Sequence, residues 1–292
     1  MEALPIGEWP TKLDESARRE LYAHRKLSEA YPDLEHLVLK KFSATLEAKP
    51  DETARFQTLL RYLNRLVDLA EGSKVLVIGC GPRPEAMKVL IQSGLSVVGI
   101  EPAPLFVRSA HEYLGCEGLV LEGAAESIPV PDDSQHLVIC DSVLEHVVSP
   151  TKSLDEMRRV LRPGGIAYIT TTNRQRLCIT GKNAEFNYSF FTLLPDIVKE
   201  SIVFQHLHYD PRLANYAPLP AVHWFSFAQL CSLGRQAGFS QFYSILDLLD
   251  PGDPAVKKSR IRRLLLNKLK FNPWLRSLAL TQIGDTIIML KR

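Results

Sequence analysis

Two glycines and an acid about twenty residues further along carry the first chemical signal in this sequence. Gly79, Cys80 and Gly81 follow an apolar run directly, and Glu101 ends a second apolar run. Glycine lets the chain turn sharply and approach a ligand closely, and the helix start that follows such a turn attracts polar groups. A carboxylate at the end of the next strand can accept both hydroxyls of a ribose. The spacing therefore predicts a pocket for a nucleotide-like ligand.

Three further motifs follow in order: Gly-Ala-Ala-Glu-Ser-Ile-Pro at 123–129, an apolar run ending in Asp-Ser-Val-Leu-Glu-His at 141–146, and Leu-Arg-Pro-Gly-Gly at 161–165. Ligands of open α/β sheets bind over the carboxyl ends of the strands. We therefore expect the first two of these motifs to share one edge of the sheet with Glu101.

This succession resembles the class I S-adenosylmethionine-dependent methyltransferases, in the small-molecule, type 11-like branch, and does so closely over residues 72–173. The resemblance implies S-adenosylmethionine as the cofactor, with Glu101 on its ribose. It implies cofactor contacts for a set of residues around the strand ends, namely Gly79, Cys80, Gly81, Glu101, Pro102, Ala125, Glu126, Asp141 and Ser142. Within this set the glycine turn holds the methionine end, Pro102 packs on adenine together with Ile128, and Asp141 and Ser142 lie beside the sulfonium and the amine.

Three residues depart from the family pattern. Val77 and Ala124 stand where relatives commonly carry acids that help to hold the cofactor, and Arg83 replaces the last glycine of the turn. Each lost polar contact weakens binding by about 1–3 kcal/mol if nothing replaces it. A non-catalytic binding protein on the same fold is therefore an alternative. A nicotinamide dehydrogenase is disfavoured because Pro82 and Arg83 break the glycine spacing that such enzymes use.

Strands alternate with helical patterns from 74 to 172, which predicts an α/β, Rossmann-like sheet with helices on both faces. The family fold implies seven strands, mostly parallel, with the last antiparallel. We expect strands six and seven at 239–247 and 285–291 and a helix at 227–237. The predicted organisation is a helical extension at 1–72, a methyltransferase domain at 73–292, a substrate-side insertion after strand five at 174–222 and a basic amphipathic segment at 254–282. Helices are expected in the extension at 13–30, 34–46 and 52–70.

Two histidines are the candidate catalytic bases. His146 follows strand four, and His223 stands where the insertion rejoins the core beside aromatic residues. The alternatives are that Glu145 and His146 cap a helix, and that His223 is a packed side chain. His206 and His208 are further candidates for an acceptor pocket.

The segment 141–146 is also similar to an acid-rich element with which some O-methyltransferases of the ubiquinone pathway hold a divalent ion. Ser142 replaces one of those acids, so we assign no metal ligand, and a metal-assisted O-methyltransferase stays an alternative.

Composition narrows the partners and the compartment. A net charge of +2 gives no reason to expect nucleic acid, and the five cysteines form no CxxC pair, which predicts a reduced, cytoplasmic setting. The sequence shows no leader peptide and no bilayer-length apolar run.

Eight basic and no acidic residues between Asp253 and Asp285 leave two interpretations of 257–280, a helix packed on the core or a peripheral contact on the cytoplasmic face of a membrane. The predicted reaction is methyl transfer, on oxygen, to a small molecule or a glycan or lipid-linked sugar; the sequence predicts no oligomeric state.

Overall fold

The computed structural model describes residues 53–174, 193–205, 221–257 and 260–291. Its strands are β1 (Lys74–Ile78), β2 (Ser96–Glu101), β3 (Val120–Glu122), β4 (Gln135–Asp141), β5 (Leu161–Thr170), β6 (Gln241–Ser244) and β7 (Thr286–Leu290). Its helices are α4 (Thr53–Leu63), α5 (Glu85–Gln92), α6 (Pro104–Leu114), α7 (Pro150–Val160), α8 (Asp196–Gln205), α9 (Phe227–Gln236), α10 (Ile245–Leu248), α11 (Pro254–Lys257), α12 (Arg260–Phe271) and α13 (Pro273–Ile283).

The strands form one seven-stranded sheet in the order β3-β2-β1-β4-β5-β7-β6. The pairs among β1 to β5 are parallel, and β7 runs antiparallel to both β5 and β6. The chain order reverses beside β1, between β1 and β4, where doubly wound sheets bind their ligands at the carboxyl ends of the strands. The predicted fold class is confirmed.

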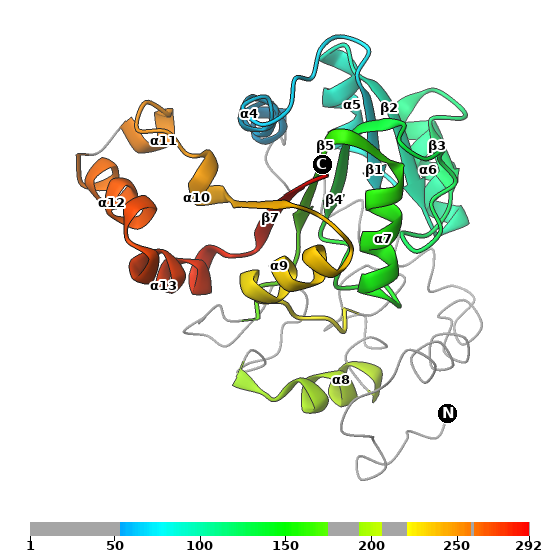
Figure 1. Cartoon of the computed structure of the whole chain (residues 1–292). Coiled ribbons are helices and arrows are strands. Elements are labelled where there is room, and N and C mark those ends of the chain that lie inside the picture. The colour runs from blue at the N-terminus through cyan, green and yellow to red at the C-terminus, as the bar shows by residue number, and fades with distance from the viewer. Residues whose placement is uncertain (1–52, 175–192, 206–220, 258–259, 292) are drawn as a thin grey trace.

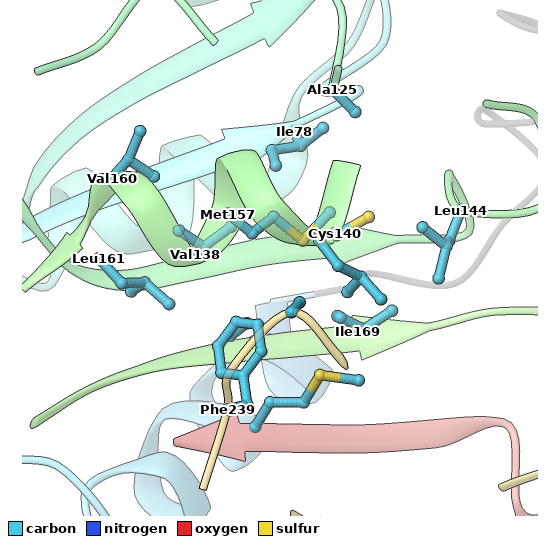
Figure 2. Packing of buried hydrophobic residues seen from close by; sticks show 14 of the residues in the cluster. Ile78, Ala125, Val138, Cys140, Leu144, Met157, Val160, Leu161, Ile169 and Phe239 are labelled. Carbon is cyan, nitrogen blue, oxygen red and sulfur yellow. The ribbon is translucent and has the colours of Figure 1, made fainter. Parts of the chain in front are cut away.

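Alternate residues of each strand feed two apolar layers, one on each face of the sheet. Leu76 and Val138 join a layer that α7 and α9 cover, whereas Val75 and Leu137 join a layer that α4 and α5 cover. Figure 2 shows the first layer, with Met157 of α7 lying against the strands and Phe239 packed beside β7. The period of two in a strand explains why neighbouring residues serve opposite layers. Helices therefore cover both faces, as Figure 1 shows.

Helix α4 packs on the sheet through an apolar stripe. Phe56, Leu59 and Leu63 are buried in the second layer, and Val67 joins them beyond the helix end. The helix ends at Leu63, whereas a longer helix over 52–70 is expected from the sequence. The predicted helices at 13–30 and 34–46 lie outside the described residues.

Strand six is shorter than predicted, because the chain turns into α10 after Ser244. Ser244 N–H donates to Asp247 Oδ2 at 2.7 Å, and the two residues form a capping box. A Ser with an acid three residues later marks a helix start, so the prediction of a strand through Asp247 is wrong for a reason visible in the sequence.

The basic amphipathic segment forms three helices, α11 to α13, inserted between β6 and β7. Leu269 packs against a small apolar cluster, but Leu264 and Leu265 are exposed. Leu264 and Leu265 of this segment therefore do not pack on the core.

Candidate functional site

The glycine turn after β1 needs glycine at two places. Gly79 and Gly81 have φ values of 62° and 69°, a region that residues with a Cβ atom rarely adopt. A Cβ atom on Gly79 would lie 2.4 Å from Cγ2 of Val143, in the segment after β4. The turn thus packs against the neighbouring strand end, which leaves no space for a side chain at Gly79. Cys80 continues it with its backbone N–H donated to Ile100 O at 3.2 Å.

Glu101 ends β2 with its carboxylate directed at this turn. Gly81 N–H donates to Oε2 at 3.0 Å, and Ala103 N–H donates to Oε1 at 3.2 Å. The side chain is 4% exposed, and burial raises its pKa to about 7, although the two backbone donors oppose that shift. Each carboxylate oxygen has two lone pairs, so each keeps one after its backbone bond. Two acceptors side by side suit two vicinal hydroxyls.

Asp141 ends β4 and is held by a residue that sequence reasoning missed. Arg55 of α4 donates to Asp141 Oδ2 at 2.8 Å, and Thr170 at the end of β5 donates to Oδ1. The pair joins the N-terminal helix to the edge of the sheet where the glycine turn lies. No local motif reveals this contact, because the two residues are 86 positions apart.

Ser142 follows with φ = 57°, one of two described non-glycine residues with positive φ. Its N–H donates to Thr170 Oγ1 at 3.0 Å and Thr170 O at 3.1 Å. Such backbone geometry concentrates at ligand sites, where the surroundings stabilise it.

Ala125 and Glu126, which are neighbours in the motif 123–129, lie in different surroundings. Ala125 is buried in the apolar layer shown in Figure 2, while the Glu126 carboxylate accepts Val148 N–H at 2.7 Å and Ser149 N–H at 3.2 Å. Glu126 therefore fixes the loop after β4. Pro102 is exposed beside Glu101, and Ile128 is buried.

The residues that depart from the family pattern have structural roles here. Val77 is buried in the second apolar layer, and the guanidinium of Arg83 lies 5.3 Å from the ring centre of Tyr113 on α6. Arg83 thus joins the turn to α6.

His146 lies in a turn between β4 and α7, and no helix begins there. Helix α7 starts at Pro150, and Ser149 caps it by accepting Lys152 N–H. The alternative in which Glu145 and His146 cap a helix is therefore wrong. His146 is half-buried in the turn.

Glu145, beside it, is buried and ties this turn to the end of β5. Thr171 Oγ1 donates to Glu145 Oε2 at 2.9 Å, and Thr172 Oγ1 donates to Oε1 at 3.4 Å. A buried carboxylate that binds two hydroxyls fixes the backbone on which His146 stands.

His223 packs against the same turn from the end of the insertion. Its Nε2 lies 2.8 Å from Val147 O, its ring is stacked on Phe225, and the N–H groups of Val222 and His223 both donate to Glu145 O. A carbonyl only accepts, so Nε2 carries the proton and donates it to Val147 O. His206 and His208 lie outside the described residues.

The described part of the insertion adds a buried amine that the sequence analysis did not single out. Lys199 of α8 is buried, its Nζ lies 5.2 Å from the ring centre of Trp224, and Asp196 is 3.4 Å away. Burial lowers the pKa of this ammonium, and Asp196 opposes the shift. Helix α8 therefore contacts the segment 221–225 through Lys199 and Trp224, and that segment lies next to the turn that carries His146.

Within the described ranges, no three His, Cys, Asp or Glu side chains gather in a way that would hold a metal ion. None of the described helices has the length and apolar character that crossing a membrane requires.

Residues 76–169 match the family described as a methyltransferase domain. These residues contain the glycine turn, Glu101, the loop after β4 and most of β5. Residues 76–169 therefore carry a methyltransferase domain. S-adenosylmethionine is the cofactor of that domain.

Similar proteins extend the match beyond that domain. A ubiquinone biosynthesis O-methyltransferase of Pseudomonas fluorescens is 31% identical over 158 residues, which are 49% of this chain and 65% of that protein. A protein of Mycolicibacterium vanbaalenii named as an uncharacterized methyltransferase is 33% identical over 105 residues, 35% of this chain and 40% of that one. The chain thus spans just under two thirds of the length of the first relative.

One solved structure shares the fold over most of the chain. It is a chain of the complex between the Haloferax volcanii Trm112 methyltransferase activator and a methyltransferase, with a TM-score of 0.50 and 18% identity over 88% of this chain and 97% of that one.

Proposed function

We propose that this protein transfers a methyl group from S-adenosylmethionine to an oxygen atom of a small molecule or of a glycan or lipid-linked sugar unit. The observation that supports it most is the Glu101 carboxylate, buried beside a glycine turn with one acceptor site left on each oxygen. The Pseudomonas fluorescens relative, named as an O-methyltransferase, supports oxygen as the acceptor atom.

The residues at the strand ends fit the cofactor by their chemistry. Glu101 would accept the two ribose hydroxyls, and Gly79 and Gly81 offer backbone without side chains where a ligand approaches. Arg55 and Asp141 form a cation and an anion at the same edge, and these complement the carboxylate and the ammonium of a methionine group. Pro102 and Ala125 would bound the adenine with apolar surface.

The cofactor, when bound, supplies an electrophilic methyl group on a sulfonium. The chain must align the acceptor and remove its hydroxyl proton. We assign the base to His146, since the turn that carries it is fixed by Glu145 and is not part of a helix. We assign His223 a positioning role through Val147 O, because its Nε2 already carries a proton to that carbonyl.

The alternative function is a binding protein that has kept the fold without catalysis. Val77 packed in the core and Ala124 in place of an acid are the observations that favour it. The metal-assisted alternative draws no support from the described side chains, which hold no candidate metal cluster.

The test is a calorimetric titration of the full chain with S-adenosylmethionine, S-adenosylhomocysteine and NAD, followed by transfer of a labelled methyl group to a panel of hydroxyl acceptors. We expect both sulfur compounds to bind and NAD to fail. Binding of NAD in preference to both would contradict the proposed function. Binding of the sulfur compounds with no transfer to any acceptor class would favour the non-catalytic alternative.

A further inference from the structure

The helices between β6 and β7 expose large apolar side chains that the core does not use. Phe271 is 84% exposed, Trp274 is 76% exposed and Leu264 is 64% exposed. Leu265 and Leu278 are exposed as well. Exposed large side chains that gather in one place mark an interaction surface more often than a random scatter does.

These side chains lie on a single side of each helix. Arg260, Leu264, Lys268 and Phe271 follow one another at spacings of four, four and three residues along α12, so they share one helix face. Trp274 and Leu278 are four residues apart on α13. We call this set, together with Leu265, the α12–α13 surface.

The opposite side of the same helices accounts for the packing that holds them on the domain. Leu266 and Leu280 are buried in a cluster with Leu246 and Val256. Figure 1 shows α12 and α13 side by side at the margin of the molecule, beyond α10 and away from α6 and α7. The α12–α13 surface is therefore not required to bury the core.

The charge of this surface has one sign. Residues 254–284 contain eight Lys and Arg residues and no Asp or Glu, and Arg260 and Lys268 are exposed on the face that carries Leu264. Two acids flank this stretch on its N-terminal side: Asp247 pairs at 2.5 Å with Arg276, which is one of the eight, and Asp253 pairs at 2.9 Å with Arg65, which lies outside the stretch. Neither acid is paired with Arg260 or Lys268. The exposed cations thus face solvent beside Leu, Phe and Trp.

We propose that the α12–α13 surface docks the protein onto an anionic lipid bilayer. A helix that lies in the membrane interface presents Leu, Phe and Trp toward the acyl chains and keeps Lys and Arg at the level of the headgroups. Trp favours the interface itself, and each basic residue near an anionic surface strengthens the attachment. The site of methyl transfer does not contribute to this surface, so the docking holds or fails independently of the proposed function.

The experiment measures co-sedimentation of the full chain with vesicles of phosphatidylcholine alone and of phosphatidylcholine mixed with phosphatidylglycerol. We expect binding to the mixed vesicles at low salt, at least about tenfold weaker binding to phosphatidylcholine, and release at high salt because ions screen the charges. Equal binding to both vesicle types, or none to either at low salt, overturns the proposal.

Substitutions separate the two contributions. Phe271→Ser and Trp274→Ser together should lower the partition coefficient at least about tenfold, and Arg260→Glu with Lys268→Glu should do the same. Leu193→Ser is the matched control for Leu264→Ser, since both side chains are 64% exposed and only Leu264 belongs to the surface. The proposal fails if Leu193→Ser weakens vesicle binding as much as Leu264→Ser.

Trp274 supplies a direct probe. The chain has three tryptophans, and Trp224 is buried whereas Trp274 is exposed. Mixed vesicles should shift the fluorescence to shorter wavelength, and Trp274→Phe should remove that shift without removing binding. A shift that persists in Trp274→Phe would contradict the α12–α13 surface as the docking face. The proposal would also fail if the protein does not bind the vesicles but forms a dimer that Phe271→Ser dissociates.

Discussion

Glu101 and His223 are both buried at the same end of the sheet, but their hydrogen bonds leave them with different capacities. Glu101, 4% exposed, accepts one backbone N–H on each oxygen and keeps a lone pair on each. His223, 9% exposed, carries the proton on Nε2 to Val147 O, and its ring is stacked on Phe225. The first arrangement leaves a carboxylate ready for a ligand, and the second arrangement fixes a backbone turn.

Burial of a polar side chain does not by itself indicate function. What matters is how many donor or acceptor sites remain after the protein's own bonds are counted. By this count Glu101 keeps two acceptor sites for a ligand, while His223 holds the turn that carries His146.

The largest effect is expected from the base. His146→Gln should lower single-turnover methyl transfer about 10²-fold or more, with S-adenosylmethionine affinity within about threefold of wild type. His223→Ala should lower transfer about tenfold, because the turn loses its contact at Val147 O. His223→Gln, whose amide can donate to that carbonyl, should keep transfer within about threefold.

This series distinguishes the two histidines. If His223→Gln loses transfer as severely as His146→Gln, then His223 acts as the base through Nδ1 and the contrast with Glu101 is wrong. The measurement pairs cofactor titration with single-turnover transfer on each variant.

The glycine turn should be the next most sensitive element. Gly79→Ala places a Cβ atom 2.4 Å from Val143 Cγ2 at a φ of 62°, and overpacking of this kind costs about 1–3 kcal/mol of stability. Cofactor affinity should fall at least about tenfold because Val143 or the turn must move. Gly164→Ala is the control, since Gly164 has a φ of 77°, open space around it and a place near the opposite end of β5. Equal melting temperatures and equal cofactor affinities for Gly79→Ala and Gly164→Ala would contradict this prediction.

The raised pKa of Glu101 predicts a pH dependence of cofactor binding. With a pKa of about 7, roughly one tenth of the carboxyl groups are ionised at pH 6, so affinity should fall about tenfold between pH 8 and pH 6. Calorimetry on wild type and Glu101→Gln in the same buffers checks this, because titration of the ligand itself affects both proteins. A profile that is as steep in the variant would assign the dependence to another group.

The raised pKa of Glu101 also makes the stability of the folded protein depend on pH. The unfolded carboxyl ionises near its ordinary value of 4.5 and the folded one near 7, so the unfolded state loses its proton first. Glu101 therefore lowers the free energy of unfolding as pH rises through that interval, and thermal melts of the ligand-free protein should show less of this decline in Glu101→Gln.

The smallest of these effects concerns the N-terminal helix. Arg55→Ala should weaken S-adenosylmethionine binding about fivefold, because the cation beside Asp141 is half-exposed and solvent screens it. Arg65→Ala removes a comparable ion pair, to Asp253, away from the strand ends and should leave affinity unchanged. Calorimetry on both variants is the measurement, and an equal effect of the two would show that helix packing, not the cation at the site, is what matters.

The parts of the site that sequence reasoning predicted are those made by neighbouring segments. The turn at Gly79–Gly81 and Glu101 follow consecutive strands, so their meeting follows from the parallel sheet alone. The alternation of strands and helices along the sequence predicted the sheet with helices on both faces. Both faces are apolar, since neighbouring strand residues such as Val75 and Leu76 are buried in opposite layers.

The parts that escaped prediction depend on contacts between distant segments. Arg55 meets Asp141 across 86 positions and His223 meets Val147 across 76, and no local pattern encodes either pair. The early end of strand six is different, since Ser244 and Asp247 at capping-box spacing signal a helix start in the sequence itself.

Two acids at the ends of adjacent strands allow a matched test of the proposed role of Glu101 in cofactor binding. Glu101 and Glu122 are paired in register between β2 and β3, yet Glu101 is buried beside the glycine turn and Glu122 is exposed. Calorimetric titration with S-adenosylmethionine at pH 8 should show at least about tenfold weaker binding for Glu101→Ala, because a charged hydrogen-bond acceptor contributes about 1.5–3 kcal/mol, and unchanged binding for Glu122→Ala. Wild-type affinity in a folded Glu101→Ala variant would contradict the assignment of the cofactor edge.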